Sequence, residues 1–263
     1  MTLIERSNHC TIHAADRIAT ITIVNAGTLN ILATPVIDDI ARRIELLRNE
    51  SDLRVLVLRG SGDKAFIGGA DIKEMAGLRR ESAERFISGL RRLCDAVRQF
   101  PLPVIARMPG WSLGGGLEVA LACDIRIASD TARFGMPEVK VGIPSVIHAA
   151  LMPRLIGSAH ARWLMLTGES VDAEQARAWG LVDRVVPLAE LDAEVARVAS
   201  LLAGLGTQAV RQQKRLLREW EERPLEQSIA ESVAEFGSAF ASGEPQRYMG
   251  EFIERQRDKK SAR

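Results

Sequence analysis

Two glutamates stand out because they lie in segments that carry almost no other charge. Glu118 is the only acidic residue between Pro101 and Cys123, and Glu138 lies in the mostly apolar stretch 134–139. Burial of a carboxyl group disfavours its charged form and raises its pKa towards the range that general acid and base catalysis uses. An ordinary surface or structural role is the commoner use of such an acid, and the sequence alone does not show that the two meet.

A glycine-rich segment at residues 110–116 lies between an expected strand and an expected helix. Two nucleotide-binding patterns fail there, because GxGxxG would need glycine at Val119, and GxxxxGK[ST] would need lysine where the last glycine of the run stands. The nucleophile-elbow pattern GxSxG does match, with Ser112 at its centre. A serine hydrolase also needs a later acid and histidine, yet only His148 and His160 follow, the first after 148 − 112 = 36 residues. A serine hydrolase is therefore a minor alternative.

The third interpretation of this segment is an oxyanion hole. The N–H of Gly115 would lie at the start of a helix, where free N–H groups and the helix dipole favour negative charge. A second glycine turn at 66–71 also precedes a helix-like segment and would supply a second N–H. Losing one such donor typically costs about 2.7–4 kcal/mol of transition-state stabilisation. Two ordinary tight turns would give the same spacing, so both explanations stay open at this point.

Strand-like and helix-like segments alternate between residues 17 and 128, which predicts an α/β core. Thr34, Ser82 and Asp172 are the expected helix caps. From about residue 191 the pattern is helical only, so we predict a catalytic core at 1–190 and a helical region at 191–263. The expected strands are 17–24, 54–59, 103–107, 124–128 and 181–186, and the expected helices are 34–49, 82–100, 117–123, 158–168 and 172–180.

Composition excludes several classes of protein. The 263 residues carry a formal net charge of +1 and only 5% aromatic residues, so neither a basic excess nor stacking platforms predict a nucleic-acid partner. No apolar run of about 18 residues would span a membrane, and the first residues lack a signal-peptide pattern. The three cysteines, odd in number and without CxxC, favour unpaired thiols in a reducing compartment. We therefore expect a cytoplasmic protein without membrane or nucleic-acid partners.

Several motifs, in order between residues 17 and 187, resemble the enoyl-CoA hydratase/isomerase (crotonase) family, and most closely its enoyl-CoA hydratases. They are KAFIGGADIKEM at 64–75, PVIA at 103–106, GGGLEVA at 114–120, CDIRIA at 123–128, RFGMPE at 133–138, and LTG at 166–168 with GLVD at 180–183. Because several motifs match in the same order, chance does not explain the resemblance. The C-terminal helices match only loosely.

The resemblance implies an architecture and a substrate. The implied fold is a crotonase-like spiral of ββα units with a C-terminal helical region that builds trimers, usually paired into hexamers. The implied substrate is an acyl-CoA thioester, as in fatty acid metabolism, with coenzyme A as part of the substrate and no separate cofactor. His9 and His13 are ordinary strand or surface residues rather than metal ligands, so no metal site is expected. The expected partners are the acyl-CoA and further copies of the chain.

The resemblance also assigns roles by position. Glu118 and Glu138, which are 138 − 118 = 20 residues apart, would be the two catalytic acids. They would hold a water over the double bond of a 2-enoyl-CoA and form the 3-hydroxyacyl-CoA reversibly. The backbone N–H groups of Ala70 and Gly115 would form the oxyanion hole. The candidate CoA-binding and substrate-binding residues are Gly69, Asp71, Ile72, Lys73, Trp111 and His148.

The chain departs from the family after the second acid. Hydratases of the family usually have a glycine-rich turn there, whereas Ile147 and His148 stand in place of small residues in this chain. The acyl chain of the substrate is therefore open. His148 is either a polar group of the pocket or a packed helix residue, and Trp111 either lines the acyl pocket or simply packs. Residues 25–30 also lack the usual basic residue near the CoA end.

Retention of both acids favours hydration over the other reactions of the family. Isomerases of the family commonly lack the acid at the position of Glu118, which is present here. The alternative within the fold is a double-bond isomerase, a thioester hydrolase or a decarboxylase acting on an acyl-CoA. A CoA-binding protein without catalytic activity is a further alternative, which the two acids argue against.

Overall fold

The computed structural model describes residues 3–261, and the chain divides into two compact units, residues 1–202 and 203–263. The first unit extends past residue 190 because an ion pair holds the start of helix α7 (Leu191–Ala203) to it. Asp192 on α7 accepts hydrogen bonds from the buried Arg107, with 2.5 Å between Nε of Arg107 and Oδ1 of Asp192. A buried guanidinium needs such a partner, so the start of α7 belongs with the catalytic core.

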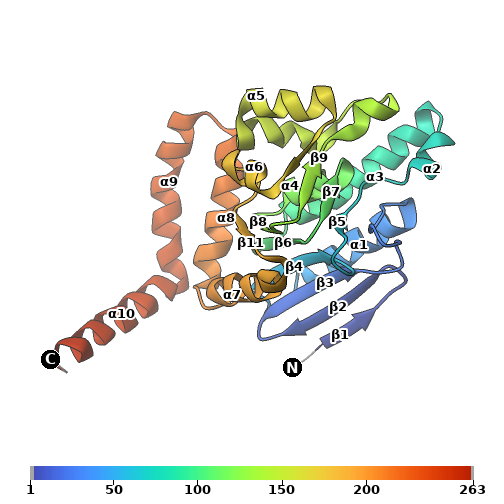
Figure 1. Ribbon diagram of the computed structural model, residues 1–263. Coiled ribbons are helices and arrows are strands. Elements are labelled where there is room, and N and C mark those ends of the chain that lie inside the picture. The colour runs from blue at the N-terminus through green and yellow to red at the C-terminus, as the bar shows by residue number, and fades with distance from the viewer. Residues whose placement is uncertain (1–2, 262–263) are drawn as a thin grey trace. The chain divides into compact units, whose positions relative to one another are not determined.

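The first unit contains a seven-stranded sheet in the order β1-β2-β3-β4-β6-β8-β11 (Figure 1). Its strands from β3 onwards are parallel, whereas β1 and β2 form an antiparallel extension. The strands are β1 (Leu3–Arg6), β2 (Cys10–Ala15), β3 (Ile18–Ile23), β4 (Val55–Gly60), β6 (Val104–Met108), β8 (Ile125–Ser129) and β11 (Arg184–Val186). The five strands expected from the sequence all belong to this sheet. Four of them have five or six residues with a continuous or alternating apolar pattern, whereas β11 occupies only the last three residues of the expected strand 181–186.

A second sheet of four short strands has the order β10-β9-β7-β5. Its members are β5 (Ala65–Ile67), β7 (Trp111–Leu113), β9 (Arg133–Gly135) and β10 (Ser170–Asp172). Strands of three residues carry no readable periodicity, so the sequence did not predict them. The glycine-rich segment expected as a turn therefore contains β7, which pairs in parallel with β5 and β9.

Each turn of the chain gives one strand to the large sheet, one to the small sheet and then a helix. The succession is β4-β5 followed by α3 (Arg80–Arg98), β6-β7 followed by α4 (Gly115–Ala122), and β8-β9 followed by α5 (Met152–Thr167). The short helix α2 (Ile72–Ala76) precedes α3, and the 3₁₀ helices η1 (Pro137–Val141) and η2 (Ile147–Leu151) precede α5. This is the stack of ββα units that the sequence led us to expect.

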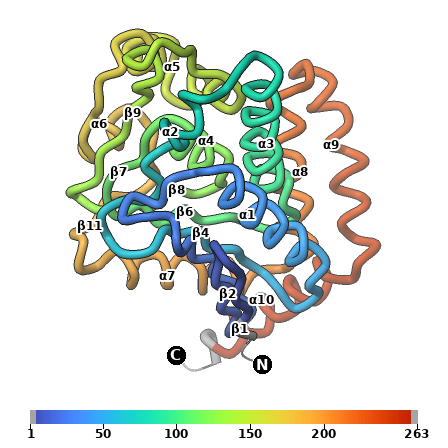
Figure 2. Tube along the Cα trace, turned by 90° about the vertical axis from the view of Figure 1, so that its right-hand side faces the viewer, coloured from blue at the N-terminus to red at the C-terminus, as the bar shows by residue number. Residues whose placement is uncertain are grey.

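Helix α1 (Thr34–Leu47) packs against α3, and the two lie beside each other in Figure 2. The apolar stripes predicted for both helices are buried in the common core of the first unit. They comprise Val36, Ile37, Ile40, Ile44 and Leu47 on α1, and Phe86, Leu90, Leu93 and Val97 on α3. All three cysteines are buried in this unit.

The helix starts differ from the expected ones where the side chain of the expected cap forms a contact with another part of the chain. Thr34 is the first residue of α1 rather than its cap, because its N–H and hydroxyl both bind Glu74. Ser82 lies in the first turn of α3, where its hydroxyl accepts from the N–H of Arg79. Asp172 does cap α6 (Ala173–Ala178), accepting from the N–H of Gln175 at 2.9 Å. Gly157, with φ +78°, breaks α5, so a helical segment does begin at residue 158 as expected.

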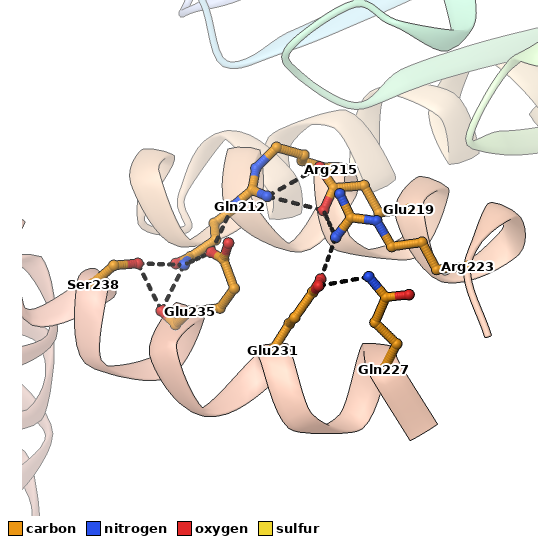
Figure 3. A network of polar contacts seen from close by, with 8 residues as sticks. All are labelled: Gln212, Arg215, Glu219, Arg223, Gln227, Glu231, Glu235 and Ser238. Carbon is orange, nitrogen blue, oxygen red and sulfur yellow. Dashed lines mark hydrogen bonds and ion pairs between the residues drawn. The ribbon is translucent and has the colours of Figure 1, made fainter. Parts of the chain in front are cut away.

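The second unit is helical, with α8 (Thr207–Glu222), α9 (Leu225–Ala239) and α10 (Glu244–Ser261). A network of polar contacts joins α8 to α9 (Figure 3). Arg215 binds Glu235 and Arg223 binds Glu231, each with a nitrogen–oxygen distance of 2.5 Å. The remaining short helices of the chain are η3 (Leu188–Glu190) and η4 (Phe240–Ser242). Among the described residues, no helix combines the length and hydropathy of a membrane span.

Candidate active site

A cavity of about 200 Å³ in the first unit brings together both glutamates and both glycine turns. Its wall includes Glu118 and Glu138, the backbone at 68–70 and the backbone at 114–115. The rest of the wall is mainly apolar and comes from α2, α3, β7 and the segment 137–146. The apolar side chains are Ile72, Met75, Phe86, Ile87, Leu90, Leu113, Val141, Ile143 and Val146. A cavity of this kind suits an apolar ligand whose polar group meets a few fixed donors and acids.

Glu118 lies in the first turn of α4 and is only 3% exposed. The pKa of its carboxyl group is raised to about 8, chiefly by burial and to a smaller extent by the charge of Glu138, while a hydrogen bond from the N–H of Ala149 acts in the opposite direction. That N–H donates to Oε1 of Glu118 at 3.1 Å and also to the carbonyl of Val146 at 2.9 Å. The carboxyl group is therefore held by a single shared N–H in an apolar surrounding.

Glu138 lies on η1 and reaches the same cavity from the other side of the glycine turn. Burial raises the pKa of its carboxyl group, while hydrogen bonds from its own backbone N–H and from Ser145 lower it. The hydroxyl of Ser145 donates to Oε2 of Glu138 at 2.9 Å. Because the charge of Glu138 adds to the rise in the pKa of Glu118 that burial causes, the two are expected to titrate as a pair rather than independently.

Gly114 allows the carboxyl group of Glu138 to lie close to the backbone at the start of α4. A Cβ atom at this position would lie 2.3 Å from Oε1 of Glu138, and the residue has φ +49°. Only glycine fits such a contact and such a backbone conformation. The turn therefore brings the Glu138 carboxyl group against the backbone that begins α4.

The N–H groups of Ala70 and Gly115 are both free of backbone partners in the described part of the chain. Gly115 is the first residue of α4, so its N–H has no acceptor within the helix. Ala70 forms an isolated parallel bridge with Leu32, which uses the carbonyl of Gly69 and the N–H of Asp71 instead. Both residues line the cavity, so a carbonyl oxygen entering it would find two unused donors.

The remaining residues of the 69–73 turn fall into two groups. Gly69 and Ile72 line the cavity, whereas Asp71 and Lys73 do not. Asp71 instead caps α2, accepting from the N–H of Lys73 at 2.8 Å and from the N–H of Glu74 at 3.2 Å. The carboxylate of Asp71 thus shapes the turn that carries Gly69 and Ala70.

One sequence hypothesis fails at β7, and a second stays a prediction. Trp111 is 40% exposed and is not among the residues that line the cavity, so the structure does not place it where an acyl chain would bind. Ser112 is fully buried inside the strand, and its hydroxyl has no hydrogen-bond partner among the described residues. A nucleophile elbow needs an exposed serine beside a base, so the serine hydrolase alternative is wrong.

His148 is a packed residue behind the cavity, not part of its wall. It lies on η2, is 8% exposed, and its Nε2 is 3.5 Å from Oδ1 of Asp95 on α3. Burial lowers the pKa of its imidazole, against the effect of Asp95. The hypothesis that His148 contributes a polar group to the pocket is therefore not supported by its position.

Sequence reasoning missed two groups of the site, the hydroxyl of Ser145 and the N–H of Ala149. Both come from the segment in which the chain departs from the family's glycine-rich turn. A serine beside a proline does not by itself indicate a site residue, and a backbone N–H donor leaves no mark in the sequence. Their partners are seven and 31 residues away along the chain, so only the fold reveals them.

The sequence profile of the family described as enoyl-CoA hydratase/isomerase matches residues 13–260. The chain belongs to this family. A probable enoyl-CoA hydratase of Mycobacterium bovis is 35% identical over 91% of this chain and 92% of its own, and a crotonyl-CoA hydratase of Syntrophomonas wolfei is 32% identical over 92% and 94%. The crystal structure of an enoyl-CoA hydratase from Bacillus anthracis superposes with a TM-score of 0.83 at 30% identity, covering 91% of both chains.

Membership of the enoyl-CoA hydratase/isomerase family confirms the predicted crotonase fold and the predicted class of enzyme, a carbon–oxygen lyase most similar to the enoyl-CoA hydratases. The match begins at residue 13 and runs through the C-terminal helices. It therefore covers the part of the chain in which the sequence motifs matched only loosely.

Proposed function

We propose that the protein hydrates a 2-enoyl-CoA thioester to the 3-hydroxyacyl-CoA, and that the reaction is reversible. The observation that carries the proposal is the convergence of the buried Glu118 and the half-buried Glu138 on one cavity that also contains the free N–H groups of Ala70 and Gly115. A single acid would suffice to move a proton along an acyl chain, whereas addition of water needs one group to remove a proton and one to deliver a proton.

The proposed reaction starts with one proton shared by the two acids. Glu118, ionised, accepts a proton from water as the water oxygen bonds to Cβ of the alkene. Glu138, protonated, delivers its proton to Cα, so that one water is added in total and the pair keeps one proton. The raised pKa values of both carboxyl groups support a singly protonated pair near neutral pH.

The thioester oxygen gains negative charge while Cβ is attacked. In the proposal it accepts hydrogen bonds from the N–H groups of Ala70 and Gly115. The position of Gly115 at the start of α4 adds the favourable end of the helix dipole. The turn at 69–73 would lie along the CoA moiety, with Gly69 and Ile72 in contact with the ligand and Asp71 shaping the turn.

The helical second unit supports a proposed homotrimer or hexamer. Leu225, Ile229, Val233 and Phe236 on α9 are between 54% and 75% exposed. Exposed apolar residues that repeat along one helix mark an interaction surface. A further copy of the chain is the partner we propose for this face. The cytoplasmic location expected from the sequence stays a prediction.

Purified protein should hydrate crotonyl-CoA or a longer 2-enoyl-CoA, measured as loss of the conjugated thioester absorbance. Glu118→Gln and Glu138→Gln should each lower kcat roughly 10²–10⁴-fold, because each removes one proton-transfer group, while CoA binding measured by calorimetry stays within about threefold. Wild-type hydration rates in Glu138→Gln would refute the assigned roles. Product analysis with several acyl-CoAs would reveal an isomerase, thioester hydrolase or decarboxylase instead.

A further inference from the structure

One short segment, residues 145–149, supplies hydrogen bonds to both glutamates of the site. The hydroxyl of Ser145 binds Glu138, and the N–H of Ala149 binds Glu118. The Ala149 N–H is shared with the carbonyl of Val146, which closes the first turn of η2. The position of this donor relative to Glu118 therefore depends on how η2 is held.

The backbone at the start of η2 is strained. Ile147 has φ +39°, a conformation that a β-branched residue rarely adopts. Such a conformation persists only where the surrounding structure imposes it. Ile147 precedes His148 and Ala149 directly, so the same strained turn sets the direction of both.

His148 adds a polar contact between this turn and helix α3, beside the apolar packing of η2 on the core. Its Nε2 lies 3.5 Å from Oδ1 of Asp95 on α3, and the residue is buried. Asp95 is held in turn by Arg91 one helical turn earlier, at 3.4 Å. Residues of α3 also form part of the cavity wall, so the pair joins η2 to a rigid element of the site.

We propose that His148, through its pair with Asp95, is a positioning residue that holds η2 so that the Ala149 N–H stays on the Glu118 carboxylate. His148 touches neither the cavity nor a reacting atom, so it acts only through Ala149. The kinetic part of this inference rests on the proposed hydratase function, whereas the effect on the protonation of Glu118 does not.

The protonation of Glu118 is the readout that separates positioning from general stability. A hydrogen bond from an N–H group favours the ionised carboxylate, so losing the Ala149 donor raises the pKa of Glu118 further. The other titratable group that acts on Glu118 is Glu138 on η1, and Glu118 itself adds to burial in raising the pKa of Cys94 on α3. Those that act on His148 are Asp95, Arg98 and Arg91, all on α3.

The test compares His148→Phe, which keeps a ring but removes the polar contact, with His148→Gln, which keeps an N–H donor for Asp95. Titration of the Glu118 side chain is followed by carbon-13 NMR on glutamate-labelled protein and assigned with Glu118→Gln. In His148→Phe we expect the pKa of Glu118 to rise by roughly half a unit or more. We expect His148→Gln to titrate as the wild type does.

The kcat measured with crotonyl-CoA should fall in the variant that shifts the Glu118 titration and stay close to the wild-type value in the variant that does not. In His148→Phe we expect kcat to fall about 10- to 100-fold, because the carboxylate is misplaced, and the acid limb of the pH profile to move upwards, because Glu118 must be ionised to accept the proton of the water. KM should change less than about twofold, since no group that contacts the substrate is removed. His148→Gln should restore most of kcat.

Asp95→Leu provides an independent route if His148→Phe fails to fold. It should shift the Glu118 titration as His148→Phe does, and the double variant should shift it no further than either single change. Arg91→Ala, which removes only the second partner of Asp95, is the matched control and should leave the titration unchanged. An unshifted Glu118 titration in His148→Phe, or in Asp95→Leu if the first does not fold, overturns the inference. Absence of hydration by the wild-type protein refutes the proposed function alone.

Discussion

Glu118 is an acid that the fold makes harder to ionise. Its carboxyl group lies in an apolar helix, and burial raises its pKa from 4.5 to about 8. A raised pKa in the folded state means that folding favours the protonated form, so the contribution to stability is fully present below pH 4.5 and is lost as the pH rises through about 8. The residue that the reaction needs therefore reduces the stability of the protein at alkaline pH.

Replacement of Glu118 by Gln should stabilise the protein, and increasingly so between pH 4.5 and 8. The amide cannot ionise, so the cost of burying a charge disappears, and the expected gain at pH 9 is roughly 1–4 kcal/mol. Urea denaturation at several pH values measures it. Glu226→Gln, an exposed glutamate on α9, is the control and should show no such dependence. A stability difference for Glu118→Gln that is independent of pH would contradict the assigned burial.

Ser145→Ala should move the alkaline limb of the pH profile upwards, because Glu138 must be protonated to deliver its proton. The hydroxyl of Ser145 stabilises the ionised form of Glu138, so its removal raises the pKa of that carboxyl group further above its usual range. We expect a shift of roughly half a pH unit, measured as kcat against pH with crotonyl-CoA. Ser112→Ala is the matched control, since the buried Ser112 hydroxyl has no partner in the described chain. An unchanged alkaline limb in Ser145→Ala would show that the hydroxyl does not act on the pair.

At the scale of elements, the site is assembled at the joints of the ββα units rather than within one of them. Helix α4 supplies Glu118 and Gly115, whereas η1 supplies Glu138 and η2 supplies the Ala149 donor. The large sheet holds β6 and β8 in place, and the turn between β7 and α4 is pressed against Glu138. Small backbone shifts at these joints should therefore affect catalysis more than shifts within the sheet.

Gly114→Ala tests the joint between β7 and α4. The added methyl group would meet Oε1 of Glu138, and the positive φ of residue 114 adds strain of about 1–3 kcal/mol. We expect kcat to fall at least about tenfold, because the Glu138 carboxyl group is displaced. Gly62→Ala is the control, since Gly62 has φ +66° but its Cβ would meet nothing within 4 Å. A loss of kcat in both variants would assign the effect to strain rather than to the contact with Glu138.

At the scale of the whole molecule, the two units differ in how far they bury their apolar side chains. The first unit encloses the cavity in a core built from two sheets and their helices. In the second unit the network of Figure 3 joins α8 to α9, while large apolar side chains remain exposed. In the proposed oligomer this face of α9 would be covered, and burying each such side chain would contribute about 1.5–3 kcal/mol.

The double variant Val233→Glu with Phe236→Glu should dissociate the proposed oligomer. Both side chains are at least 70% exposed on α9, so the changes leave the core of the single chain intact. Sedimentation velocity should show a trimer or hexamer for the wild type and a smaller species for the variant. Gln227→Ala, on the polar network of the same helix, should leave the oligomer unchanged. A wild-type protein that sediments as a monomer would refute the proposed assembly.

The sequence by itself determined five of the seven strands of the large sheet, the core helices and the two candidate acids. Helix α1 and strand β3 carry apolar periodicities that match one secondary structure only, and these local preferences persist in the folded protein. Glu118 stood out because it is the only acid in an apolar segment, and the ordered motifs, rather than the acid alone, pointed to the family. The glycines at 69 and 114–115 were likewise visible, because their type and spacing are local properties of the chain.

Only the tertiary structure decided what surrounds those residues. The three-residue strands of the small sheet form because neighbouring ββα units pair them, and Thr34 lost its capping role to a contact with Glu74. The exclusion of Trp111 and His148 from the cavity, and the use of Ala149 as a donor to Glu118, depend on segments that meet only after the chain has folded. Burial and hydrogen bonding across such distances set the pKa values of the acids, and no local pattern in the sequence encodes them.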